Sequence, residues 1–405
     1  MLKYLSLETS SSQFEVAPSA TESFFSGLKG TELPAFQQHT VDFANLHSVV
    51  GGFQKYKNII IIANGGSRTS ALAYWQSLAH LRNEKHVEFL STMEPDVLVA
   101  LKERFSPEDT LVMPISKSGT NVDVLEPLFQ LLDYPILAVT SPEKGVLYEI
   151  AQKYNWPIAP HPEVGGRYSG RSECAFAPVL LMGLDAEKIN TAAVGAYESL
   201  DYAAPVEGNI AYQAAAMTWR HDQQGKDEIF MPVYSESVSG FLPLAVQLIH
   251  ESTGKDGKGQ TIFGDKAPES QHHTNQRYFG GKKNVLGWFV TVDSQRSAGV
   301  KTVVPDELKD LVLRDGTLGD MDGIPLDDGL RFDYEGVAEN STERGIPHMT
   351  LKVSEVNEES MGELMSFWHY YTVYSALLRD QDPFDQPEVE DAKEVSFQKR
   401  KAYSA

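Results

Sequence analysis

The sequence predicts an α/β protein with two parallel, doubly wound sheets and a C-terminal helix. Short apolar runs rich in β-branched residues alternate with amphipathic stretches from about residue 57, and a second alternation of this kind begins near residue 205. Strands and helices in strict alternation form parallel sheets with helices on both faces. We therefore divide the 405 residues into an N-terminal arm (1–40), a first α/β domain (41–185), a second α/β domain (186–382) and a C-terminal helix (383–405).

In the first domain, short apolar runs predict strands that are buried on both faces of a sheet. The runs are 58–63 (NIIIIA), 86–91, 110–115 and 135–140. Amphipathic stretches predict the helices that connect or follow them, near 68–81, 95–105, 121–133 and 144–154. Residues 1–40 lack strong periodicity, and we expect an arm or a short helix pair that packs on a later domain.

The second domain repeats this pattern, with predicted strands at 227–235, 285–293 and 348–354 and a predicted helix at 241–252. A longer helix is predicted over 357–379, because apolar residues recur there at spacings of three, four and seven. These residues are Met361, Leu364, Met365, Trp368, Tyr371 and Leu378. We expect this apolar face to lie in the core or at a subunit interface. A final helix is predicted over 384–402, after the segment FDQP.

The composition of the chain limits the classes of molecule that it can be expected to bind. Asp and Glu (56) outnumber Lys and Arg (35), so the net charge of −21 argues against nucleic acid and favours small solutes. The apolar runs are far shorter than the ~20 residues that span a bilayer, and the first residues do not resemble a secretory signal. We therefore expect no membrane partner and a cytoplasmic location. The single cysteine, Cys174, excludes an intramolecular disulfide and a multi-cysteine metal site.

Two strand-to-helix junctions of the first domain are rich in Gly and Ser: 59–70 (IIIIANGGSRTS) and 111–121 (LVMPISKSGTN). The carboxyl ends of parallel strands form the ligand crevice of such sheets, and amide groups at helix starts attract anions. The second junction supplies hydroxyl donors and a possible helix cap, namely Ser116, Ser118, Thr120 and Asn121. Ordinary caps and turns would account for either loop alone, whereas two such loops on neighbouring strands favour a phosphate pocket. Surface carboxylates do not oppose this, because the Debye length at physiological salt is only ~8 Å.

Five further segments occur in a fixed order: ISKSGT (115–120), GGRYS (165–169), HESTGKDGKG (250–259), QHH (271–273) and FDQP (384–387). Together they resemble glucose-6-phosphate isomerase in its short bacterial or archaeal form, from about residue 57 to 393. The resemblance implies two sugar-isomerase (SIS) domains, a homodimer, and interconversion of glucose 6-phosphate and fructose 6-phosphate through a cis-enediol, without a cofactor. This reaction serves glycolysis and gluconeogenesis. Two alternatives stay open, a bifunctional phosphoglucose/phosphomannose isomerase and a non-catalytic phosphosugar-binding SIS regulator.

The resemblance assigns the phosphate of the sugar to the two Gly- and Ser-rich junctions. The residues concerned are Gly66, Ser67, Ser116, Lys117, Ser118, Thr120 and Asn121. Gly166 and Arg167 match the family's arginine loop, in which the guanidinium stabilises the negative charge of the enediol intermediate. Further along this loop, Arg171 and Glu173 replace residues that are usually apolar or small in the family.

Glu251 lies near the end of a predicted helix that Gly254 would terminate. A carboxylate there faces the negative end of the helix dipole, which costs a few tenths to ~1 kcal/mol and suggests function over stability. By resemblance, Glu251 is the base that moves a proton between C2 and C1, and Gln247, one turn earlier, contacts the substrate. His272 would open the sugar ring and reach into the neighbouring subunit's site. Lys393 would assist ring opening and charge stabilisation.

A metal site must be weighed, because His250, His272 and His273 are near Glu251 in the sequence. The HExxH zinc motif fails, since residue 254 is Gly. Adjacent histidines do not easily ligate one ion together, and no cysteine assists. We therefore expect metal-free proton transfer. A phosphosugar sensor needs the phosphate loops and not a base, so the four catalytic candidates together favour an enzyme over a regulator.

Overall fold

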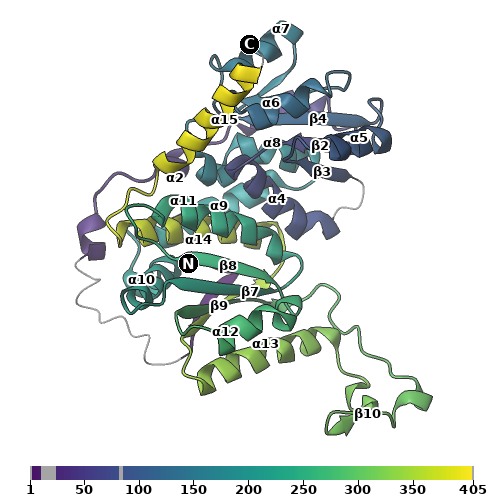
Figure 1. Ribbon diagram of the computed structural model, residues 1–405, viewed down its shortest axis with the longest axis vertical. Coiled ribbons are helices and arrows are strands. Elements are labelled where there is room, and N and C mark those ends of the chain that lie inside the picture. The colour runs from purple at the N-terminus through teal and green to yellow at the C-terminus, as the bar shows by residue number, and fades with distance from the viewer. Residues whose placement is uncertain (1, 11–23, 82–84, 404–405) are drawn as a thin grey trace.

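The computed structural model describes residues 2–10, 24–81 and 85–403, so part of the expected arm, residues 11–23, lies outside the described residues. Two five-stranded sheets dominate the described chain (Figure 1). Each carries helices on both faces, which confirms the predicted α/β class with two sheet-containing units and a C-terminal helix. The domain boundaries at 41, 186 and 383 remain a proposal.

The first sheet is entirely parallel, with strand order β3-β2-β4-β5-β6. Its strands are β2 (Asn58–Ile62), β3 (His86–Leu90), β4 (Thr110–Ser116), β5 (Ala138–Thr140) and β6 (Ile158–Pro160). The last of these was not predicted. Residues 59–62 are all buried isoleucines, because successive side chains point to opposite, covered faces.

The helices divide between the two faces of this sheet. Ile60 and Ile62 pack with residues of α5 (Pro95–Arg104), α6 (Val122–Phe129) and α7 (Val146–Tyr154). Ile59 and Ile61 share a core with helices of the other face, which are α3 (Phe43–Gly51), α4 (Gly66–Leu78) and α8 (Glu173–Leu181). The strand–helix order therefore places every βα junction of the first unit at one edge of the sheet.

The second sheet has the order β1-β12-β9-β7-β8. Four of its strands are parallel: β7 (Glu228–Tyr234), β8 (Thr261–Lys266), β9 (Val285–Ser294) and β12 (His348–Glu355). The fifth, β1 (Leu5–Thr9), runs antiparallel to β12. The second sheet is therefore parallel, as predicted, except for this edge strand, and part of the N-terminal segment is a strand where an arm or a short helix pair was expected. β1 pairs the backbone groups of β12 that would otherwise form an open edge.

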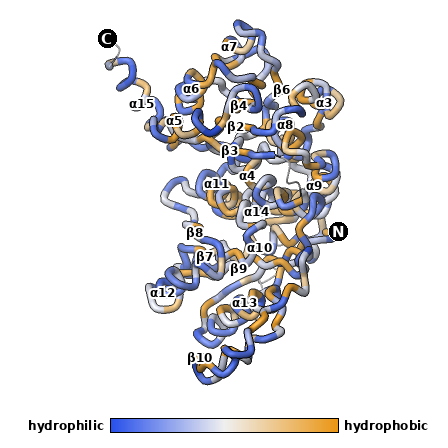
Figure 2. The backbone as a smooth tube through the Cα atoms, turned by 90° about the vertical axis from the view of Figure 1, so that its right-hand side faces the viewer, coloured by the Kyte–Doolittle hydropathy of each residue, from blue (hydrophilic) through white to orange (hydrophobic). Residues whose placement is uncertain are grey.

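The helices of the second unit also lie on two faces. One face is covered by α12 (Thr274–Gly280) and α13 (Leu326–Glu343). The other is covered by α10 (Ile210–Gln223), α11 (Leu242–Thr253) and α14 (Glu358–Leu377). In Figure 2, helices α4, α11 and α14 lie between the two sheets, so a shared helical layer joins the two units.

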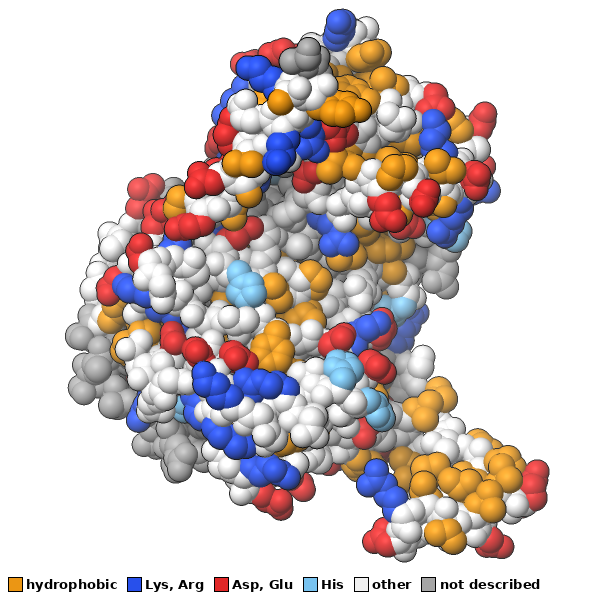
Figure 3. Space-filling view, viewed as in Figure 1, with side chains coloured by type: hydrophobic (Ala, Val, Ile, Leu, Met, Phe, Trp, Pro, Cys, Tyr) orange, Lys and Arg blue, Asp and Glu red, His pale blue; other side chains and the backbone are white. Residues whose placement is uncertain are grey.

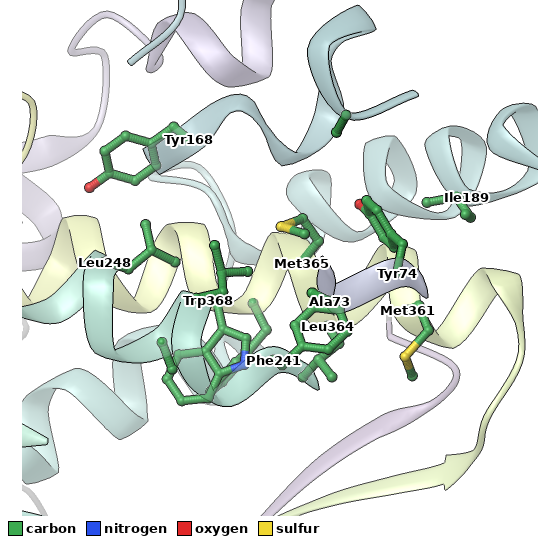
Figure 4. Close-up of a cluster of buried hydrophobic side chains, with 14 of the residues drawn as sticks. Ala73, Tyr74, Tyr168, Ile189, Phe241, Leu248, Met361, Leu364, Met365 and Trp368 are labelled. Atoms are coloured by element: carbon green, nitrogen blue, oxygen red, sulfur yellow. The ribbon is translucent and has the colours of Figure 1, made fainter. Parts of the chain in front are cut away.

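Helix α14 is buried almost all round, and the prediction of a single apolar face was wrong. Its apolar side chains meet Tyr74 of α4 and Leu248 of α11 in the core that Figure 4 shows. On its opposite side, a Cβ at Gly362 would lie 2.3 Å from a backbone oxygen of α9 (Ala186–Leu200), and Ser366 Oγ donates to Ala193 O at 3.0 Å. Small residues allow α9 to approach closely, so α14 is core and cannot form a subunit interface.

Residues 295–325 project from the second unit as an arm (Figure 1). The arm contains a small hairpin, β10 (Val312–Leu313) with β11 (Gly316–Thr317), and hydrophobic side chains gather on its surface (Figure 3). Val303 and Val312 are 83% and 82% exposed. No helix in the described part of the chain is both long and apolar enough to cross a bilayer.

The predicted final helix is α15 (Glu390–Tyr403), which contains no buried residue. Near its end, Arg400 pairs with Glu126 of α6 through Nε (2.6 Å) and Nη2 (2.9 Å). The helix therefore reaches from the segment FDQP to the first unit.

Candidate active site

A cavity of about 520 Å³ opens where the first sheet ends. Its walls come from the loops that follow β2, β4, β5 and β6, the edge at which parallel sheets bind ligands. The lining residues are Asn64, Gly66, Ser67, Ile115, Ser116, Lys117, Ser118, Asn121, Ser141, Lys144, His161, Glu163 and Gly166. Both predicted Gly- and Ser-rich junctions therefore meet in one pocket.

The loop after β4 is organised by its own hydroxyl groups. The Gly119 amide donates to Ser116 Oγ at 3.1 Å, and Ser118 Oγ lies 2.9 Å from Thr120 Oγ1. Gly119 has φ +67°, a conformation that glycine adopts without strain. Asn121 is the N-cap residue of α6, but its side chain does not cap the helix as expected. Its Oδ1 instead accepts from Ser118 Oγ at 3.3 Å, because the neighbouring hydroxyl is within reach.

The pocket continues into the arginine loop through a close backbone contact. A Cβ at Gly66 would lie 2.0 Å from the carbonyl oxygen of Gly166, so only glycine permits this approach. Ser67 follows in the first turn of α4 and is buried. The start of α4, which faces the pocket, therefore lies directly against the residue that precedes Arg167.

All three guanidinium nitrogens of Arg167 make hydrogen bonds, and its side chain is only 2% exposed. Nε donates to Ser252 Oγ at 2.7 Å, and Nη1 donates to Glu251 Oε2 at 3.3 Å and to Gln386 Oε1 at 2.6 Å. Nη2 donates to two backbone carbonyls of the segment FDQP and the residue before it. These hydrogen bonds fix the planar cation in position beside Glu251.

Glu251 occupies the last turn of α11 and is 26% exposed. Its Oε1 accepts from Gln247 Nε2 at 2.8 Å, and Gln247 Oε1 accepts from Thr69 Oγ1 of α4 at 2.8 Å. The carboxylate is therefore held between an amide and a guanidinium, and this chain of contacts links α11 to the helix that starts at the pocket. His250 points elsewhere, since its Nε2 accepts from the Ile262 amide at 3.1 Å.

Two predicted site residues do not join this cluster. His272 is exposed and ends a short 3₁₀ helix (Glu269–His272) that follows β8. The hydrogen bond from the Ile262 amide to His250 places the end of α11 beside the start of β8, and His272 follows the other end of that strand. The length of β8 therefore separates Glu251 from His272. Lys393 is 61% exposed and pairs with Glu390 at 2.8 Å. Neither His272 nor Lys393 lines the cavity.

The residues that depart from the resemblance after Arg167 serve the fold. Arg171 is buried and donates to the carbonyl oxygen of Phe36 at 2.9 Å. Glu173 accepts from His39 Nε2 at 2.6 Å and from the Asp42 amide at 3.0 Å. These charged side chains hold the segment before α3 against the arginine loop, which explains why apolar residues are not needed there.

Several polar residues of the site were not predicted. They are Asn64, Ser141, Lys144, His161 and Glu163 in the pocket, and Thr69, Ser252 and Gln386 around Glu251. Asn64 Nδ2 is buried and has no hydrogen-bond partner among the described residues, so an anion in the pocket would satisfy it. The useful signal was the strand ends, because the pocket residues all lie at or after the carboxyl ends of strands of one parallel sheet. Within residues 2–10, 24–81 and 85–403, no group of three metal-ligating side chains is placed to hold an ion.

No protein-family model matches the chain. Individual proteins do: the glucose-6-phosphate isomerase of Rubrobacter xylanophilus is 27% identical over 84% of this chain and 82% of the relative. That of Methanocaldococcus jannaschii is 24% identical over 91% of this chain and 96% of the relative. The resemblance drawn from the five motifs is thereby confirmed.

Solved structures share the fold. A hypothetical protein of Thermus thermophilus has a TM-score of 0.84 at 22% identity, covering 97% of this chain and 99% of that one. A glucose-6-phosphate isomerase of Chlamydia trachomatis has a TM-score of 0.72 at 18% identity, covering 94% of this chain and 78% of that one. At these identities the likeness concerns the fold alone.

Proposed function

We propose that this chain, which is related to glucose-6-phosphate isomerases along most of its length, interconverts glucose 6-phosphate and fructose 6-phosphate. The observation that carries this proposal is the position of Glu251. Its carboxylate lies between Gln247 and Arg167, beside a pocket whose hydroxyl groups and Lys117 suit a phosphate. A base, a fixed cation and an anion pocket are the parts that aldose–ketose isomerisation needs.

The proposed reaction begins with the phosphate in the pocket and C1 and C2 of the open-chain sugar at Glu251. The carboxylate takes the proton from C2 of the aldose, and the electron pair of that C–H bond forms the C1–C2 double bond of the cis-enediol. The negative charge that develops on the C1 oxygen is stabilised by Arg167, whose orientation is set before substrate binds. The hydroxyl proton of the C2 oxygen then passes to the C1 oxygen, Glu251 delivers its own proton to C1, and the C2 oxygen becomes the carbonyl oxygen of the ketose.

A homodimer forms part of the same proposal. His272 is far along β8 from Glu251 in one chain, which supports the role that the resemblance implies, ring opening in a second copy's site. The projecting arm, residues 295–325, supports such a contact, because its exposed apolar side chains would be covered by a second copy. We assign Lys393 to the same composite site by resemblance. We place the enzyme in the cytoplasm, where phosphosugars are produced and consumed in glycolysis and gluconeogenesis.

A coupled assay tests the proposal directly. Glucose 6-phosphate formed from fructose 6-phosphate is oxidised by an excess of a dehydrogenase, and the reduced nicotinamide is followed by absorbance. We expect turnover by the wild-type chain and a loss of roughly 10³-fold in Glu251→Gln, because positioned acid–base catalysis contributes 10²–10⁴-fold. The matched control is Glu269→Gln, a carboxylate that follows the far end of β8 and lies outside the cluster. If Glu269→Gln loses turnover and Glu251→Gln keeps it, Glu269 is the base. The same assay with mannose 6-phosphate as substrate tests whether the enzyme is a bifunctional phosphoglucose/phosphomannose isomerase.

A further inference from the structure

Two charged residues of the pocket have no role in the reaction described above. Lys144 belongs to the loop after β5, and Glu163 belongs to the loop after β6. Glu163 Oε2 lies 3.1 Å from Lys117 Nζ, and its Oε1 contacts Lys144 Nζ. Among the described residues, neither lysine pairs with another carboxylate. One acidic side chain thus bridges two ammonium groups at the wall of the phosphate-type pocket.

The backbone holds Lys144 beside the phosphate loop. The next residue, Gly145, has φ +90°, and a Cβ there would lie 2.3 Å from the carbonyl oxygen of Ser118. The Leu147 amide donates to the carbonyl oxygen of Gly119 at 3.2 Å. The loop that carries Lys144 therefore packs against the loop that supplies Ser118, and both residues line the same pocket.

The two ion pairs of Glu163, with Lys117 and with Lys144, can be broken at little cost. The side chains of Lys117, Lys144 and Glu163 are 35%, 63% and 61% exposed, and water-exposed ion pairs shift an equilibrium by only about two- to fivefold. A phosphate dianion offers more charge and more acceptor oxygens than one carboxylate, so it competes successfully for both lysines. Hydrogen bonds from Lys144 and then Lys117 lower the pKa of the Glu163 carboxyl, which keeps this internal competitor ionised at neutral pH.

We propose that Lys144 is a second cationic ligand of the substrate phosphate and that Glu163 is a built-in counter-ion, which the phosphate displaces. This inference deepens the proposed function, because it rests on the same phosphate site. Glu163 neutralises the lysines in the free protein and returns to them as product leaves. Glu163 also weakens the binding of ligands without a doubly charged group, because such ligands compete poorly for the two lysines. The pocket therefore selects dianionic phosphates over neutral sugars.

The test measures binding of inorganic phosphate to the full chain by calorimetry, which needs no turnover. Lys144→Gln should weaken binding about tenfold, the effect of losing one charge-assisted contact. Glu163→Gln should tighten binding about two- to fivefold, because the competitor loses its charge while its size is kept. The KM for fructose 6-phosphate should move in the same directions, with smaller changes in kcat, because phosphate is remote from the reacting carbons.

The matched controls are Lys153→Gln and Glu149→Gln, which make the same charge changes on α7 outside the pocket and should alter binding less than twofold. Circular dichroism checks that each variant is folded. If Glu163→Gln weakens phosphate binding, Glu163 positions the lysines and the counter-ion role is wrong. If Lys144→Gln binds phosphate like the wild type, Lys144 is not a ligand. If the binding changes occur as expected in a protein that does not isomerise fructose 6-phosphate, the proposed function fails and this inference stands.

Discussion

Mixing two inactive variants tests whether His272 acts in the partner's site. In one chain, Glu251 and His272 are separated by β8, because the Ile262 amide bonds to His250 and the strand then runs to Lys266. Four residue steps at ~3.3 Å give roughly 13 Å of strand, whereas proton transfer requires contacts near 3 Å. A composite site in a homodimer removes this conflict.

The magnitude of the effect follows from dimer statistics. In a heterodimer of Glu251→Gln and His272→Ala chains, one site carries both lesions and the other carries neither. Equal mixing gives about half heterodimers, each with one intact site of two, so about a quarter of wild-type activity should appear from two nearly inactive parents. The assay is the coupled conversion of fructose 6-phosphate after the chains are refolded together with different affinity tags.

A second mixture provides the control. Glu251→Gln chains mixed with chains that carry both substitutions contain no intact base, and they should stay inactive. If tagged heterodimers of the first mixture are isolated and are as inactive as their parents, His272 acts within its own chain or not at all. The composite site would then be refuted.

Three further predictions concern the pocket, the guanidinium and the core. Ser118→Ala should raise KM more than it lowers kcat. Activity should also survive exhaustive EDTA treatment. Loss of activity in EDTA that zinc restores would overturn the expectation of metal-free proton transfer. Arg167→Lys should lower kcat by about 10²-fold or more, since one ammonium cannot make the five hydrogen bonds that fix the planar guanidinium beside Glu251, and near-normal kcat would refute this role. Burial, and then Arg171, lower the pKa of His369 from 6.5 to about 3, so the unfolded chain binds the extra proton and stability falls as the pH falls below about 6.5. At about pH 5 the loss from this residue is about 2 kcal/mol, and urea unfolding should show a flatter pH dependence in His369→Phe; an unchanged slope would contradict the assignment.

The parts of the fold that could be predicted are those with strong local patterns. The isoleucine run of β2 and the apolar run of β4 indicate buried strands on their own. β8 was missed because it is an edge strand with the mixed sequence TIFGDK, and α13 because only Val337 and Ser341 are buried among its residues. The pairing of β1 with β12 joins residues more than three hundred positions apart, and no local pattern encodes it.

Helix α14 illustrates a different limit. Its apolar residues predict one apolar face, but they do not indicate what lies against the small and polar residues between them, such as Gly362, Ser366 and His369. In the structure these residues face other helices, where the small size of Gly362 permits close contact, Ser366 Oγ donates to Ala193 O, and His369 Nδ1 bonds to Tyr197 OH. A pattern of apolar residues cannot distinguish water from a closely packed helix as the neighbour of a serine.

The candidate site was only partly predictable for a related reason. Motifs indicated the loops after β2 and β4 and the residues Arg167 and Glu251, and the structure brings these together. Lys144 and Glu163 lie in loops without a motif, and their contact depends on the order of β4, β5 and β6 in the sheet. Applying the strand-end rule to every predicted strand would have included Lys144.

The central claim is that Glu251 carries a proton between two carbons of the sugar. Isomerisation of fructose 6-phosphate in D₂O, with the product examined by NMR at C2, tests this claim most directly. Because Glu251 is 26% exposed, the proton it carries can exchange with solvent, and the account predicts deuterium at C2 in part of the glucose 6-phosphate. Glucose 6-phosphate formed at the normal rate with no deuterium at C2 would contradict the predicted exchange of the proton on Glu251.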